Sequence, residues 1–314
     1  MVDTLVPRAE RLPAVAPTGR LLADGRPSAD VRAGLRRIAN GRNAITVMLA
    51  WVQVAAVLGA AVWIDRWWAW PIAVVLMGRS FAQLAILGHE AAHRLLFSSR
   101  RANDLVGRWL LAYPAFVPYD LYRRGHMAHH RDELGPDEPD IGLYAGYPIT
   151  RASLRRKLTR DASGISGWKN LKVLLRATLK PSSRRVALQI LGVQLVLFLG
   201  LLAAGWPQLY LVLWLLPWMT SWRVINRLRA IAEHAGMIRS ADKRQTTHHV
   251  QQHWLARFWM VPYNTGWHLA HHVDAGIPWR NLPRLHRELE LAGWVPADIV
   301  WPSYPALWRG LSAR

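Results

Sequence analysis

A run of twenty residues without a single charge, residues 45–64, constrains this chain more than any other feature. About 20 consecutive apolar residues are what a helix needs to cross the hydrocarbon core of a bilayer. Three more apolar stretches follow, at residues 67–87, 186–204 and 208–225. Four buried helices of a large soluble bundle are the alternative, but runs of this length and composition are typical of membrane spans. The sequence therefore predicts an all-α protein with four transmembrane helices, arranged as two hairpins.

The basic residues are distributed asymmetrically about these stretches. Of the 40 Lys and Arg, all but Arg66, Arg79 and Arg223 lie before the first stretch, between the second and third, or after the fourth. The positive-inside rule then places both termini and the long middle segment in the cytoplasm. A net charge of +20 would also suit a nucleic-acid-binding protein. Because these residues flank membrane spans, anionic lipid headgroups account for them, and we expect no nucleic-acid partner.

The rest of the chain predicts one domain and one arm. Residues 1–44 are basic and have no apolar core, so we expect a poorly ordered cytosolic arm, followed by a single membrane domain at residues 45–314. Residues 102–122 are apolar but interrupted by Pro114 and Pro118, which favours an interfacial or re-entrant segment. Residues 150–180 are basic and amphipathic and should lie on the cytosolic face of the bilayer. The chain has no Cys, which excludes disulfides and iron–sulfur ligation within it.

Nine of the thirteen histidines form an ordered pattern of short motifs. They are His89 and His93, then His126, His129 and His130, then His234, and finally His268, His271 and His272. Residues three and four apart share one face of a helix, so each motif can direct its imidazoles toward a common point. In the four-span topology all nine lie on the cytosolic side, close to membrane ends.

Nine imidazoles exceed what one ion needs. Four ligands satisfy zinc, and imidazole suits Zn, Cu, Fe and Ni. The pattern therefore predicts a pair of metal ions, held in a helical cap on the cytosolic side of the membrane.

Other interpretations explain fewer of the histidines. His89 to His93 reads HEAAH and matches the zinc metalloprotease motif with Glu90 as base, which would leave both H-x-x-H-H motifs without a role. The same residues contain E-x-x-H, but the soluble di-iron bundles need a second copy and further carboxylates. A metal transporter would carry ionisable residues inside its spans, where only Arg79 lies deep. We expect His248, His249 and His253 to be interfacial rather than ligands and His286 to be structural.

Three histidine motifs and their flanking residues resemble the membrane-bound fatty acid desaturase and hydroxylase superfamily. The motifs are HEAAH at 89–93, HMAHH at 126–130 and HLAHH at 268–272, with PYNTGW at 262–267 and GIPWRNLPRLH at 276–286 around the third. The resemblance covers residues 45–290. It implies two iron ions, with O2 as co-substrate, and no catalytic residues beyond the metal ligands.

The resemblance also implies how the ligands divide. One iron would take His89, His93, His126, His130 and His271, and the other would take His129, His234, His268 and His272. In the acyl-CoA branch of the superfamily an Asn near the ninth histidine approaches the second iron through water. Ala230 stands at that position here, and Glu233 and Asn264 are nearby substitutes.

The expected reaction is O2-dependent desaturation of a membrane lipid acyl chain. A hydroxylase acting on a fatty acyl chain or a carotenoid would use the same ligands and remains the alternative. The chain has no flavin or nicotinamide fingerprint, so we expect electrons from an external donor such as ferredoxin with its reductase. Five acidic residues near the motifs are expected to hydrogen-bond the distal imidazole nitrogens, namely Glu90, Asp137, Asp140, Glu233 and Asp274.

Overall fold

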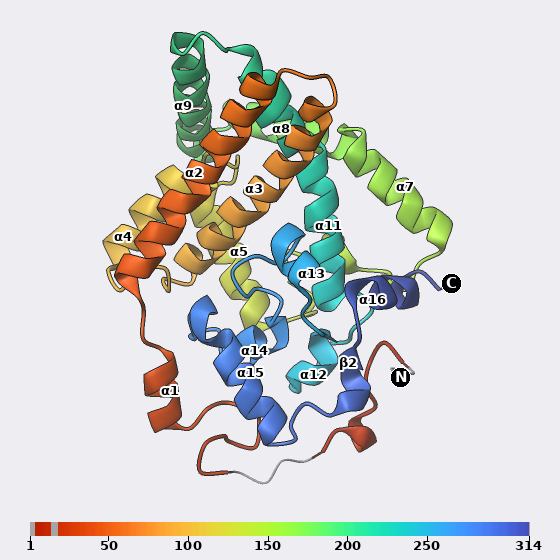
Figure 1. The fold of residues 1–314 in the computed structure, drawn as a ribbon. Helices are drawn as coiled ribbons and strands as arrows, with labels where there is room; N and C mark the ends of the chain where they lie inside the picture. The colour runs from red at the N-terminus through yellow and green to blue at the C-terminus, as the bar shows by residue number, and fades with distance from the viewer. Residues whose placement is uncertain (1–3, 14–17, 314) are drawn as a thin grey trace. The chain divides into compact units, whose positions relative to one another are not determined.

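The structure, a computed structural model, describes residues 4–13 and 18–313, and these residues are mostly helical (Figure 1). The first elements are η1 (Ala9–Arg11), α1 (Ala29–Leu35), α2 (Asn40–Ile64), α3 (Ala69–Ala92), α4 (Arg100–Val106), η2 (Gly107–Ala112), α5 (Tyr119–Arg131), α6 (Ile141–Tyr144), α7 (Arg151–Ala162), α8 (Ile165–Ala177) and α9 (Pro181–Ala203). The later elements are η3 (Tyr210–Leu215), α10 (Leu216–Met219), α11 (Ser221–His234), α12 (Lys243–Thr246), β1 (His249–Val250), α13 (Trp254–Trp259), α14 (His268–Val273), η4 (Trp279–Asn281), α15 (Leu282–Leu291), η5 (Ala297–Ile299), β2 (Val300–Trp301) and α16 (Tyr304–Leu311). Strands β1 and β2 pair in parallel.

Three helices are long and apolar enough to cross a membrane. They are α2, α3 and α9, with 25, 24 and 23 residues. They coincide with the first three apolar stretches of the sequence, and their length and composition indicate a membrane protein. Helix α3 continues beyond its predicted end and carries His89 in its last turn.

The fourth apolar stretch, residues 208–225, is not one continuous helix. It consists of the π-helix η3, the short helix α10 and the beginning of α11. Pro217 has no N–H to donate, and the backbone leaves helical geometry at Thr220, where φ is −120° and ψ is −89°. Four spans stay a prediction, because the described residues contain three helices of spanning length.

The two segments with unusual composition are helical as well. Residues 150–180 form α7 and α8, which are separated at Gly164, where a φ of +79° favours glycine. Residues 102–122 comprise most of α4, the π-helix η2, an irregular turn that contains Pro114 and Pro118, and the start of α5. The prolines interrupt this segment, as expected, while its position relative to a bilayer stays a prediction.

The chain divides into two compact units. Unit 1 comprises Met1–Ile38, Arg123–Leu154 and Leu228–Arg314, and unit 2 comprises Ala39–Tyr122 and Arg155–Arg227. In unit 1, α14 and α15 pack around an apolar core that includes Leu269, Leu285 and Trp294. Leu21 and Leu35, from the predicted arm, are buried in the same core. The domain boundary at residue 45 stays a prediction, and residues 1–3 and 14–17 of the arm lie outside the described residues.

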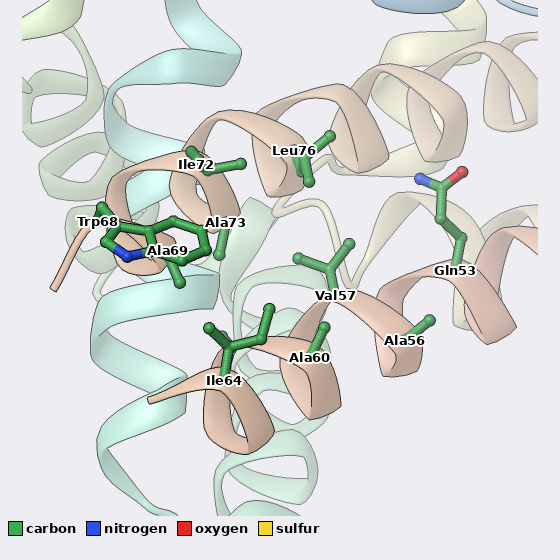
Figure 2. Close-up of a pocket in the computed structure, with 11 residues that line it drawn as sticks. Gln53, Ala56, Val57, Ala60, Ile64, Trp68, Ala69, Ile72, Ala73 and Leu76 are labelled. Carbon is green, nitrogen blue, oxygen red and sulfur yellow. The ribbon is translucent and has the colours of Figure 1, made fainter. Parts of the chain in front are cut away.

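In unit 2, α2 and α3 pack side by side along their lengths (Figure 1). A groove of about 230 Å³ lies between them, and Figure 2 shows its almost entirely apolar lining. Gln53 is the polar residue at one end of this groove (Figure 2). It donates to Ser80 Oγ (3.0 Å) and Gln83 Oε1 (2.7 Å) and accepts from Arg79. Arg79, the charged residue deep in the second apolar stretch, thus lies within a polar network of α2 and α3.

Candidate metal centre

Seven of the nine predicted ligands lie in unit 1, on three helices. Helix α5 carries His126, His129 and His130, α11 ends at His234, and α14 carries His268, His271 and His272. The i, i+3, i+4 spacing on α5 and α14 puts three rings on one face of each helix, as the sequence predicts. Six of the seven are buried, and His130 is partly buried.

The Nε2 atoms of these histidines face one another in two groups. In the first, His130 Nε2 lies 3.1 Å from His126 Nε2 and 3.0 Å from His271 Nε2. In the second, His268 Nε2 lies 3.0 Å from the Nε2 atoms of His234 and His272. His129 joins the second group, because its ligand atom is within 4.8 Å of those of His234 and His272.

This arrangement fits metal ions better than hydrogen bonds. A ring nitrogen carries either one hydrogen or one lone pair in the ring plane, so it can pair well with one neighbour. His130 and His268 each present Nε2 to two other nitrogens. A cation bound at about 2.0–2.1 Å by imidazoles at right angles places adjacent nitrogens about 3 Å apart. The donor set and its spacing therefore fit two first-row transition ions.

The remaining two predicted ligands, His89 and His93, lie in unit 2 at the end of α3. One helical turn separates them, and their ring centroids are 4.7 Å apart. Both rings can therefore serve one ion from the same side of the helix. Their place in the ligand set stays a prediction, as does the division of the nine histidines between two ions.

Burial keeps most of these rings neutral. It lowers the pKa of His271 to about 3 and holds the pKa values of His234, His268 and His272 well below the usual range. His129 is different: burial opposes its protonation, but the hydrogen bond with Glu138 and the charges of nearby carboxylates together outweigh burial and raise its pKa. Neutral rings offer the lone pairs that a metal requires.

Hydrogen-bond acceptors lie at Nδ1 of two of the rings, His129 and His234. Nδ1 of His129 is hydrogen-bonded to Glu138, which also accepts from the Tyr144 hydroxyl and the Leu134 N–H. Nδ1 of His234 lies 2.8 Å from the carbonyl oxygen of Thr246. An acceptor at Nδ1 fixes the hydrogen there and leaves the Nε2 lone pair for a ligand.

Glu133 is the second buried carboxylate at the site. Its Oε1 lies 2.8 Å from Nδ1 of His272, although the two groups do not meet hydrogen-bond geometry. Lys243 Nζ donates to the same oxygen at 2.6 Å, and the Thr246 hydroxyl donates to Oε2. Glu133 is therefore held in place by unit 1 residues beside the histidine ring.

The acidic partners found match those expected from the sequence only in part. Asp274 forms an ion pair with Arg32 instead of holding a histidine. Glu233 accepts from Arg229 at 2.5 Å and lies 3.6 Å from Nδ1 of His268. The residues around the histidine motifs do not identify Glu133 and Glu138 as their partners. The conformation of the turns that follow α5 determines which carboxylate lies beside the rings.

Ala230, at the position of the tenth metal contact, is buried and has no polar side-chain atom. The two substitutes considered for this contact, Asn264 and Glu233, have other partners. Asn264 donates to the carbonyl oxygen of Trp279 at 3.2 Å and accepts from Arg257 at 3.3 Å. Glu233 faces Nδ1 of His268, on the side of the ring away from the other Nε2 atoms.

Two further histidines are engaged by backbone carbonyls. His248 is buried with Nε2 2.8 Å from the carbonyl oxygen of Ala235, and His253 is exposed with Nε2 3.1 Å from that of Pro302. Neither contributes to the two nitrogen groups described above.

Comparison with known proteins gives a consistent family relationship. Residues 65–297 match the family described as fatty acid desaturase. Dihydrorhizobitoxine desaturase of Bradyrhizobium elkanii is 28% identical over 83% of this chain and 79% of its own length. The sn-1 acyl-lipid omega-3 desaturase (ferredoxin) of Nostoc sp. is 24% identical over 82% of this chain and 77% of its own length. The acyl-lipid omega-3 desaturase (cytochrome b5) of Arabidopsis thaliana is 33% identical, but over only 26% of this chain and 21% of its own length.

Proposed function

This chain belongs to the fatty acid desaturase family and is an oxidoreductase enzyme, and we propose that it is an O2-dependent di-iron desaturase of a membrane lipid acyl chain. The observation that carries the proposal is the pair of nitrogen groups in unit 1, in which Nε2 atoms approach one another at 3.0–3.1 Å. With His89 and His93 added, the nine histidines provide five ligands for one ion and four for the other.

The chemistry fits the family and the donor set. Two iron ions with O2 supply the oxidising power to remove two hydrogens from adjacent unactivated carbons of the chain. The overall reaction consumes O2, two electrons and two protons, and it yields one double bond and two water molecules. The protein contributes imidazole ligands, two of them fixed by Glu138 and Thr246, in a buried setting.

The membrane arrangement supports access to lipid from the cytosolic side. We propose that η3, α10 and the beginning of α11 together complete a fourth span beside α2, α3 and α9. The positive-inside rule then places both termini and the metal centre in the cytoplasm, within a helical cap.

We propose that the electrons come from another protein, because the sequence shows no flavin or nicotinamide fingerprint. One relative is named for ferredoxin and another for cytochrome b5. We propose ferredoxin, with its reductase, because an acidic carrier is attracted to the strongly basic cytosolic segments.

A second substrate class has a specific observation in its favour. Dihydrorhizobitoxine desaturase aligns with most of this chain, and its name specifies dihydrorhizobitoxine rather than an acyl lipid. A compound of that class is therefore the alternative substrate for the same desaturation.

The deciding experiment is product analysis in a host that expresses the full-length chain with a ferredoxin and its reductase. Mass spectrometry of the lipid extract should find an acyl chain two hydrogens lighter than in the host alone. The His129→Ala variant should insert into the membrane but form no product. An added oxygen would identify the hydroxylase alternative, a product only with added dihydrorhizobitoxine would identify the second substrate class, and product from His129→Ala would contradict the ligand assignment.

A further inference from the structure

A third group of potential ligands lies in unit 1, outside the nine-histidine pattern. It consists of His249 on β1 and of His286 and Glu290, one turn apart on α15. One ligand atom of each residue lies within 4.8 Å of the others. The rings of His249 and His286 have centroids 4.3 Å apart, and His286 Nε2 is 3.1 Å from Glu290 Oε1.

The two histidines are buried with unsatisfied nitrogens. Each residue is only 5% exposed, and the Nδ1 atoms of both His249 and His286 are buried without a hydrogen-bond partner. Burying a polar nitrogen without a partner costs free energy, which a bound ligand would recover. Two such nitrogens within one small cluster point to a missing ligand.

The electrostatics favour a cation. Burial, reinforced by the neighbouring His286, lowers the pKa of His249 to about 3, and burial also lowers the pKa of His286. Both rings are therefore neutral at physiological pH and offer lone pairs. The Glu290 side chain is 53% exposed, so it offers a carboxylate oxygen to the cluster and connects it with solvent.

We propose that His249, His286 and Glu290 bind one divalent transition-metal ion, such as zinc, in a site separate from the nine-histidine centre. Two imidazoles and a carboxylate are common ligands of zinc, and three protein ligands leave a position for water. The 4.3 Å ring separation is close to the 4.5 Å between His268 and His272 in the main centre.

The connection along the chain gives this ion a structural role. His249 and His286 flank the segment that contains α14, whose His268, His271 and His272 form the third motif. A metal bound by both residues closes this segment into a loop and restricts the conformations available to it. The ion would thus hold the third motif in position without contacting the substrate.

The metal content of the purified full-length protein tests this proposal. Wild type, Glu290→Ala and His249→Ala are grown with zinc and iron, passed over a chelating resin, and analysed for metal per chain. We expect both variants to contain one metal ion per chain fewer than wild type. His253→Ala is the matched control, because it removes an exposed histidine of the same segment, and its metal content should equal that of wild type.

A second measurement uses zinc alone. Metal-free wild type should gain several degrees in melting temperature when zinc is added, and Glu290→Ala should gain clearly less. Because Glu290 is exposed, this variant should fold even if His249→Ala does not. Equal metal content and equal zinc stabilisation in wild type and Glu290→Ala would overturn the proposal. Both measurements compare a variant with wild type and look for a difference of one ion per chain. The result therefore does not depend on which metal the main centre binds or which reaction it performs.

Discussion

Glu138 is the residue on which the environment of His129 most depends. It lies 5% exposed, accepts hydrogen bonds from the Tyr144 hydroxyl and the Leu134 N–H, and is hydrogen-bonded to Nδ1 of His129. These bonds outweigh the effect of burial and lower the pKa of Glu138, so the carboxylate stays ionised. An ionised partner makes the ring a stronger metal ligand.

Replacing Glu138 with Gln should weaken metal binding while preserving shape. The amide keeps the size of the side chain but loses its charge, and we expect metal affinity and product formation to fall about 10–100-fold. Metal titration and product analysis measure both. Tyr144→Phe is the control, since it removes one bond to Glu138 and should have a smaller effect; an unchanged affinity in Glu138→Gln would show that the carboxylate does not support the site.

The sequence predicts the histidines better than it predicts their partners. Spacing at i, i+3 and i+4 is a local property, so the clustering on α5 and α14 follows from it. The acceptor for His234 is the backbone carbonyl of Thr246, and because every residue has a backbone carbonyl, the sequence cannot identify it. Glu133 reaches His272 only because distant segments pack together, and that information is not local.

At the scale of helices, the close approach of η2 to its neighbours depends on Gly107. A Cβ at this position would lie 2.6 Å from Cε2 of Tyr119 and 2.9 Å from Cβ of Ala91. Both distances are shorter than side-chain carbons tolerate, so only glycine permits this packing in unit 2. The sequence shows the glycine, but the neighbours that require it become visible only in the fold.

Gly107→Ala should therefore destabilise the protein. Overpacking of this kind costs about 1–3 kcal/mol, and thermal unfolding in detergent measures it. Gly200→Ala on α9 is the matched control, because no atom lies within 4 Å of its added Cβ. We expect the control to be neutral or slightly stabilised, and equal effects of the two variants would contradict the packing argument.

An ion pair connects α1 with the residue just after α14. The Asp274 side chain is only 4% exposed, and Arg32 donates to both of its carboxylate oxygens. Although burial alone would raise it, the pKa of Asp274 is lowered by the hydrogen bonds from Arg32 and the Gly276 N–H. A buried carboxylate that loses its partner is strongly destabilising.

Arg32→Met should lower the free energy of unfolding by about 1–3 kcal/mol, less than for a fully buried pair because Arg32 is 42% exposed. Arg20→Met is the control. Arg20 and Glu288 also form an ion pair, but their side chains are 61% and 22% exposed, so its loss should cost less stability than the loss of the Arg32 pair. Thermal unfolding of the two variants compares them directly, and an Arg32→Met protein as stable as Arg20→Met would refute the role assigned to this pair.

For the molecule as a whole, hydrophobic length predicted three of the proposed spans and charge predicted their orientation. The fourth stretch shows the limit of that reasoning. Its composition is apolar, but the helix changes from π to α geometry within it and is interrupted at Thr220, three residues after Pro217. The mean hydropathy of a stretch does not reveal such a break, because it depends on side-chain polarity and not on backbone hydrogen bonds.

The absence of cysteine allows a direct test of the topology. A single cysteine introduced at Ala204, in the turn after α9, should react with a membrane-impermeant maleimide in intact cells. A cysteine at Ser163, between α7 and α8, should react only after the cells are opened. Both positions are exposed in the structure. The reverse pattern, or labelling of both in intact cells, would contradict the proposed orientation.

The polar network around Arg79 has a consequence for how the protein is made. A guanidinium halfway along α3 is costly to expose to lipid tails, and Gln53 of α2 supplies one of its hydrogen-bond acceptors beside Gln83 of α3. Helix α3 is therefore poorly suited to enter the bilayer alone as it leaves the ribosome. We expect the translocation machinery to retain α2 until α3 emerges and to release the two into lipid together as a preformed pair.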